Sequence, residues 1–129
     1  MTTLYLLRHA HAGDPERWAG DDDLRPLSDK GTRQCQRLGA LLAGWNDAPD
    51  LFVTSPRVRA AQTAEIVAGA LGVKVEADDR LAGPLDATVA DAIAVAHGAD
   101  RTCLVGHDPD FSYLLGELTG VSEVPMRKG

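Results

Sequence analysis

The chain has 129 residues, of which 44% are hydrophobic and 25% are charged, and its net charge at pH 7 is −6. This length predicts one domain, residues 1–129, that needs no disulfides to fold. The charge argues against nucleic acid and anionic membranes as partners, no apolar run is long enough to span a bilayer, and no basic leader precedes the first apolar segment. We therefore expect a cytoplasmic protein.

Hydrophobic periodicity and turn residues predict strands that alternate with helices along the whole chain. The predicted strands cover residues 4–7, 51–54, 73–75 and 102–106. The predicted helices cover residues 28–45, 55–71, 88–97 and 108–119, and residues 10–27 and 78–86 are expected to form loops. Such alternation predicts an α/β fold, a three-layer α/β/α sandwich around a mostly parallel sheet. The apolar strand 102–106 should lie in its centre.

Several residues indicate where the helices begin, end and face the core. Ser28 and Ser55 are predicted N-caps, the latter followed by Pro56, and Gly72 and Gly98 are expected to end their helices. Apolar residues at helical spacing predict the buried face of each helix. For the first helix these residues are Cys35, Leu38, Leu41, Leu42 and Trp45, and for the third they are Val89, Ile93 and Ala96. Cys35 and Cys103 lack the spacing of a metal or redox pair, so we expect buried free thiols.

Three predicted strands end in polar residues. Arg8 and His9 follow the first strand, Arg57 and Arg59 follow the second, and His107 follows the fourth. Ligands of open α/β sheets bind outside the carboxyl ends of the strands, so these side chains can converge on one anion. A phosphoryl group would suit them.

Arg57 and Arg59 fall in the first turn of a predicted helix, where the helix dipole disfavours a cation. A bound dianion would offset this cost and would also accept hydrogen bonds from the helix N–H groups. The two arginines are two residues apart and should point in different directions. We expect Arg59 to face the anion, Arg57 to be solvated or paired with an acidic residue, and the run Asp21, Asp22 and Asp23 to form a solvated loop.

His9 can act as a phosphoryl acceptor, because neutral imidazole carries a nitrogen lone pair near physiological pH. Arg8, Arg59 and His107 can neutralise the equatorial oxygens of the transferring group. The chain has no Gly-rich loop ending in Lys-Ser or Lys-Thr and no obvious metal-binding carboxylates beside these histidines, so we expect no metal and no cofactor. Alternatively, His9 is a core histidine and Arg8 an ion pair at a strand end.

These residues resemble the motifs of the histidine phosphatase superfamily, whose phosphoglycerate mutase-like members carry Arg-His-Gly after the first strand. Here that triplet reads Arg8-His9-Ala10, residues 55–64 match the second arginine motif, and residues 105–109 match the second histidine motif. The resemblance implies that His9 is the phosphorylated nucleophile and that Arg8, Arg59 and His107 bind phosphate. It also implies a final strand after residue 129, so the domain is expected to lack a C-terminal strand.

The chain departs from larger members of that family, since residues 80–83 contain no glutamate acid and no long lid insertion is present. It is most similar to the compact SixA-type phosphohistidine phosphatases. An imidazole leaving group departs without a strong proton donor, so we expect a phosphatase that acts on a phosphohistidine-containing signalling protein. Asp14, Asp86 and Asp108 remain unassigned as donors. The alternatives are a small-molecule phosphomonoesterase, a phosphoryl-binding module without turnover, and a purely structural domain.

Overall fold

A computed structural model describes residues 3–108 and contains one parallel sheet with the strand order β1-β4-β2-β3. Its strands are β1 (Thr3–Arg8), β2 (Leu51–Thr54), β3 (Lys74–Ala77) and β4 (Arg101–Gly106). β4 pairs with both β1 and β2, which confirms its central position. All three pairings are parallel, so β1, β2 and β4 present their carboxyl ends at the same edge.

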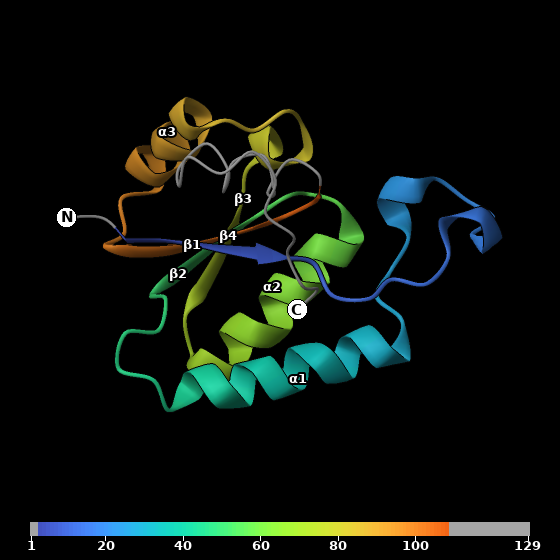
Figure 1. Ribbon diagram of the computed structural model, residues 1–129, viewed down its shortest axis with the longest axis horizontal. Coiled ribbons are helices and arrows are strands. Elements are labelled where there is room, and N and C mark those ends of the chain that lie inside the picture. The colour runs from blue at the N-terminus through green and yellow to red at the C-terminus, as the bar shows by residue number, and fades with distance from the viewer. Residues whose placement is uncertain (1–2, 109–129) are drawn as a thin grey trace.

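Within residues 3–108, three helices complete the sandwich, with α1 (Asp29–Ala43) and α2 (Val58–Leu71) on one face of the sheet and α3 (Ala87–His97) on the other (Figure 1). Short 3-10 turns are η1 (Pro15–Arg17), η2 (Asp22–Leu24) and η3 (Asp79–Ala82). The predicted three-layer α/β/α architecture is confirmed. The predicted helix 108–119 falls almost entirely outside the described residues.

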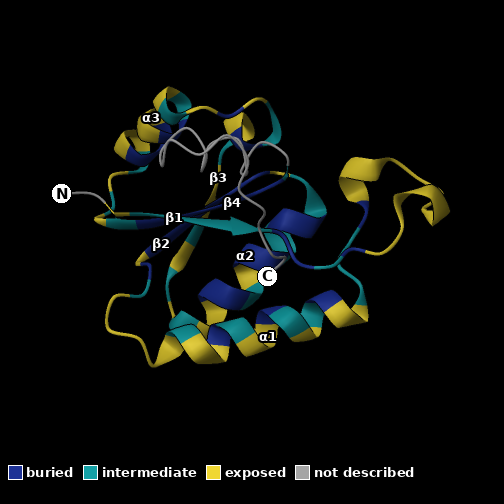
Figure 2. Ribbon diagram, in the orientation of Figure 1, coloured by how far each residue is buried: buried dark blue, intermediate teal, exposed yellow. Residues whose placement is uncertain are grey.

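The core is divided between the two faces because successive strand residues point to opposite sides of the sheet. Phe52 and Cys103 pack with α1 and α2, whereas Val53 and Leu104 pack with α3. These four residues belong to β2 and β4. Both strands are central and buried along nearly their whole length, which explains their continuous apolar sequence. Figure 2 shows the corresponding buried surface of α2 toward the sheet.

Local signals placed some helix ends correctly and one incorrectly. Ser28 Oγ accepts from Gly31 N–H as the N-cap of α1, and Gly72 and Gly98 adopt the left-handed conformation that ends α2 and α3. The predicted N-cap Ser55 was wrong, since α2 begins at Val58 and its N-cap is Arg57, which makes no side-chain capping bond. Ser55 instead contributes its hydroxyl to the site described below.

Helical periodicity also predicted more buried positions than the fold provides. Leu41 is 75% exposed because α1 buries only a narrow stripe, and Trp45, which is 45% exposed, lies beyond the end of α1 at Ala43. In α3 the predicted inner residue Ala96 is exposed, and Ala90 and Ala94 are buried beside Ile93. These predictions were wrong for Leu41, Trp45 and Ala96.

Both cysteines are free and buried, as expected, and burial raises the pKa of each thiol. Within residues 3–108 no helix has the length and apolar character to cross a membrane.

Candidate active site

The carboxyl ends of β1, β2 and β4 surround a cavity of about 240 Å³. Ten residues line it, and they are Arg8, His9, Ala12, Gly13, Pro15, Arg25, Arg57, Arg59, His107 and Asp108. The structure therefore brings together all four predicted site residues, Arg8, His9, Arg59 and His107, from three separate segments of the chain. Parallel pairing is the cause, because it places the three strand exits side by side.

His9 is held in a defined tautomer by the backbone. Its Nδ1 lies 2.7 Å from the carbonyl oxygen of Ala10, and a carbonyl can only accept, so Nδ1 donates and Nε2 carries the lone pair. The ring is buried, with 8% of the residue exposed, yet it lines the cavity. Nε2 is thus the nitrogen able to attack phosphorus.

His107 faces His9 with a ring-centroid separation of 5.2 Å. Burial, the largest cause, and the positive field of His9 and of the nearby arginines together lower the pKa of His107 to about 3. The imidazole is therefore neutral at pH 7. Its Nε2 lies 2.8 Å from Ser55 Oγ, and when that hydroxyl donates, the ring proton resides on Nδ1 as a hydrogen-bond donor.

Arg59 projects from the first turn of α2, where the helix dipole disfavours a cation. No acidic residue in that turn offsets this unfavourable interaction. The compensation comes from Asp22 in η2, whose carbonyl accepts from Arg59 Nη1 at 2.7 Å and whose carboxylate accepts from Nη2 at 3.1 Å. Burial lowers the pKa of Arg59, and Asp22 opposes that shift. The aspartate run is exposed as expected, and Asp22 serves in addition as the counter-ion of this cation.

Arg57 corrects another expectation. It lines the same cavity as Arg59, although a separation of two residues predicted that only one of them would. As the N-cap, Arg57 has an extended backbone outside the helix, so helical spacing does not govern its direction. The predicted pairing with an acidic residue is confirmed, since Nε lies 3.0 Å from Asp23 Oδ1, and Nη2 donates to Ala82 O at 3.3 Å.

The remaining charges belong to Arg8 and Arg25. Arg8 Nη1 forms an ion pair with Asp108 Oδ2 at 3.0 Å. Arg25 is 8% exposed, donates from Nη1 to Ala12 O at 2.6 Å, and pairs through Nε with Asp22 Oδ1 at 2.8 Å. The cavity thus has four arginines along its wall, and their carboxylate partners belong to Asp22, Asp23 and Asp108.

Sequence reasoning missed several residues that build this site. Thr63 Oγ1 accepts from Ala10 N–H at 3.1 Å and donates to Arg59 O at 2.8 Å, so it joins the β1 exit to α2. Ser55 and Arg25 were also missed as site residues. Ser55 stands at a predicted cap, Arg25 in a predicted loop and Thr63 inside a predicted helix, and only the tertiary contacts reveal their roles.

The β1 exit is also joined to α1. His11 O accepts from the backbone N–H and from the hydroxyl of Ser28, and His11 Nδ1 lies 2.7 Å from that hydroxyl. Gly31 in α1 lies so close that an added Cβ would stand 2.0 Å from His11 O. Ala10, where the family motif has glycine, adopts no positive φ and is fully buried, so an alanine fits here.

Several buried nitrogens around His9 lack a protein acceptor. Within the described residues, Nε of Arg8, Nε of Arg59 and Nδ1 of His107 find no hydrogen-bond partner. Buried donors without partners are rare and each requires an explanation. An oxyanion in the cavity would supply the missing acceptors. No three His, Cys, Asp or Glu side chains within residues 3–108 are arranged to hold a metal ion.

Comparison with known proteins agrees with this geometry. Residues 4–83, more than half of the chain, match the model of the histidine phosphatase superfamily, branch 1. An uncharacterized protein of Picosynechococcus sp. is 38% identical over 118 residues, which cover 83% of this chain and 67% of that protein.

Solved structures give the same result. The proposed phosphohistidine phosphatase SixA of Agrobacterium tumefaciens superimposes with a TM-score of 0.79 at 27% identity, over 91% of this chain and 76% of that one. The protein histidine phosphatase SixA in complex with tungstate superimposes with a TM-score of 0.83 at 25% identity, over 98% and 83% of the two chains. The chain belongs to the histidine phosphatase superfamily, branch 1.

Proposed function

We propose that the protein hydrolyses phosphohistidine in another protein through a phosphorylated His9. The observation that carries this proposal is the set of buried nitrogens of Arg8, Arg59 and His107 that have no acceptor within the described residues and surround the cavity lined by His9. The equatorial oxygens of a phosphoryl group would supply acceptors to them, and phosphoryl transfer depends mainly on positioning and charge neutralisation.

In the first step, the lone pair on Nε2 of His9 forms a bond to phosphorus. The bond between phosphorus and the substrate imidazole breaks, its electron pair remains on the leaving imidazole, and that ring takes a proton from water. In the second step, a water oxygen attacks phosphorus, the bond to Nε2 breaks, and phosphate leaves while the water proton passes to solvent. Arg8 and Arg59 hold the oxygens throughout, and neutral His107 donates from Nδ1.

The carboxylates near the cavity support imidazole as the leaving group. Arg25 lowers the pKa of Asp22 through a hydrogen bond, which keeps Asp22 ionised and unable to donate a proton at neutral pH. Asp108 is paired with Arg8, while Asp14 caps η1 and Asp86 caps α3. Phosphohistidine suits such a site, because imidazole leaves readily, whereas an alkoxide requires a strong acid.

The test uses the His9→Ala variant and a phosphohistidine peptide carrying labelled phosphate. The wild-type protein should release phosphate and, after rapid quenching, carry acid-labile and alkali-stable label on His9. The variant should show neither. Label on another residue, or normal turnover by the variant, would reject His9 as the nucleophile. Equal rates on a sugar phosphate and on the peptide would favour a small-molecule phosphomonoesterase, and phosphate binding without hydrolysis would indicate a binding module.

A further inference from the structure

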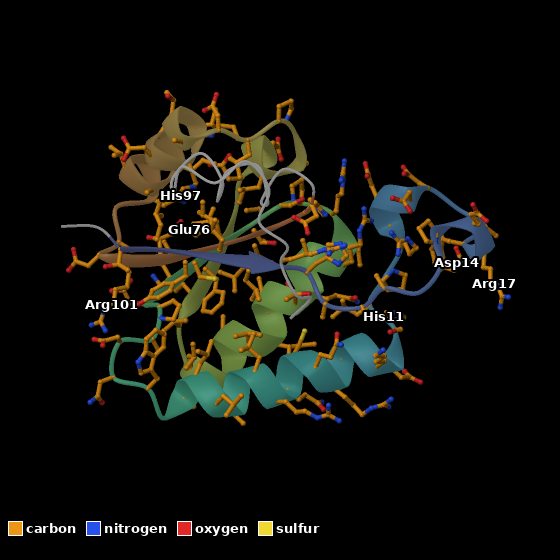
Figure 3. The ribbon with its side chains drawn as sticks, in the orientation of Figure 1. His11, Asp14, Arg17, Glu76, His97 and Arg101 are labelled. Carbon is orange, nitrogen blue, oxygen red and sulfur yellow. The ribbon has the colours of Figure 1, made fainter. Side chains whose placement is uncertain are left out.

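A projecting segment, residues 14–24 between β1 and α1, lies beside the catalytic cavity and is called the arm here. Every residue of the arm is exposed, and the arm extends away from the three layers (Figures 1 and 2). Figure 3 places Asp14 and Arg17 toward its outer end and His11 at its base, near the start of α1. The arm therefore adds surface next to the site.

The arm is tied to the arginines of the cavity. Asp22 accepts two hydrogen bonds from Arg59, and Asp23 pairs with Arg57. Internal bonds give the arm a defined shape, because Asp14 and Asp21 cap its two turns and Trp18 Nε1 donates to Asp21 O at 2.9 Å. A partner bound to the arm would consequently be held at a fixed position relative to the phosphate-binding groups.

The surface chemistry of the arm differs from that of the cavity. The arm contains five acidic residues, Asp14, Glu16, Asp21, Asp22 and Asp23, and one basic residue, Arg17. It also exposes two large apolar side chains, Trp18 at 39% and Leu24 at 60%. An acidic surface with exposed apolar side chains is suited to a partner that is basic and partly apolar.

A second cavity of about 250 Å³ lies between the arm and the body. Trp18, Pro26 and Leu27 supply its apolar wall. It shares Ala12, Gly13 and Arg25 with the catalytic cavity, so the two are adjacent. A chain whose phosphohistidine enters the catalytic cavity could therefore place a neighbouring apolar side chain in the second one.

We propose that the arm is the docking surface for the protein substrate, which carries lysine or arginine residues and one large apolar side chain beside its phosphohistidine. This inference rests on the proposed function and adds the class of substrate. The basic residues pair with Asp14, Glu16 and Asp21, the arm carboxylates that do not pair with cavity arginines, and the apolar side chain packs against Trp18 in the second cavity. A small phosphate ester has no further side chains that could contact Trp18 or the carboxylates of the arm, so only a protein substrate would use this surface.

The experiment compares two phosphohistidine peptides of equal length, one with lysines and a leucine around the phosphohistidine and the other with glutamates replacing the lysines. Phosphoramidate serves as a substrate too small to reach the arm. The test variant combines Glu16→Lys with Trp18→Ser. The control variant combines Glu65→Lys at an exposed position of α2 with Trp45→Ser just after the end of α1, and it makes the same chemical changes away from the arm.

For the wild-type protein, kcat/KM should favour the basic peptide by roughly tenfold or more. The test variant should lose most of this preference through a higher KM, while its phosphoramidate turnover stays within about twofold of wild type. The control variant should keep the preference. Equal kcat/KM for the two peptides in the wild type, or an unchanged preference in the test variant, would overturn the docking surface. Failure of the wild type to hydrolyse any of these substrates would refute the proposed function itself.

Discussion

Gly31 provides a sharp test of how the catalytic strand exit is positioned. A Cβ built at Gly31 would lie 2.0 Å from the carbonyl oxygen of His11, whereas real Cβ contacts do not fall below 3.0 Å. The Gly31→Ala substitution must therefore move the first turn of α1 and the segment after β1 apart by at least about 1 Å. Both partners are backbone, so no flexible side chain can absorb the displacement.

The expected effects follow from that displacement. Overpacking of this kind destabilises a protein by about 1–3 kcal/mol, and a clash between backbones belongs at the upper end of the range. The displaced carbonyl lies two residues after His9, and a misplacement of about 1 Å at a reacting group can lower the rate roughly 100-fold. We expect both a lower free energy of unfolding in urea and a large loss of kcat on a phosphohistidine peptide.

Gly69→Ala is the matched control. A Cβ at Gly69 in α2 meets nothing within 4 Å, so the substitution should stabilise the helix by about 0.5–1 kcal/mol and leave kcat unchanged. A Gly31→Ala protein with wild-type stability and turnover would refute the claim that close approach of α1 positions the strand exit.

Four further outcomes are expected. Thr63→Val removes the acceptor of the buried Ala10 N–H, so urea denaturation should show a free energy of unfolding lower by about 1–3 kcal/mol. Thr63→Ser keeps the hydroxyl and should recover the lost stability. Ser55→Ala removes the partner of His107 and should reduce kcat roughly tenfold in single-turnover assays; an unchanged kcat would exclude a positioning role. Asp22→Asn deletes a negative charge beside Arg59, so inorganic phosphate should inhibit turnover more strongly in this variant than in the wild type. Weaker inhibition would contradict the idea that the Asp22 carboxylate and phosphate compete for Arg59. The pKa of His107 is lowered from 6.5 to about 3, mainly by burial, so between these pH values the unfolded chain binds more protons than the folded one. The free energy of unfolding should therefore fall as pH is lowered through this window. In His107→Gln it should fall less steeply.

Local signals in the chain were sufficient for the fold. Apolar strands, the N-cap Ser28 and the terminating glycines Gly72 and Gly98 act through neighbouring residues, so their effects can be read from short segments. The order of polar residues at the strand exits was enough to predict that His9 and His107 meet, because parallel strands end at one edge.

Other features depend on which surfaces meet, and no local pattern contains that information. The sequence of residues 21–23 has the composition of a solvated loop, yet in the fold Asp22 and Asp23 neutralise Arg59 and Arg57, which lie more than thirty residues away. Likewise, Leu41 has helical spacing but remains exposed, because burial depends on how α1 is turned against α2.

The sequence by itself determined the α/β class, the alternation of elements and the residue types available for phosphoryl transfer, because these arise from contacts between near neighbours. Only the tertiary structure decided which carboxylates balance the arginines, that Ser55 bonds His107, and how the arm lies beside the cavity. Those properties arise from atoms that are distant in the chain and that come within hydrogen-bonding distance only when the layers pack.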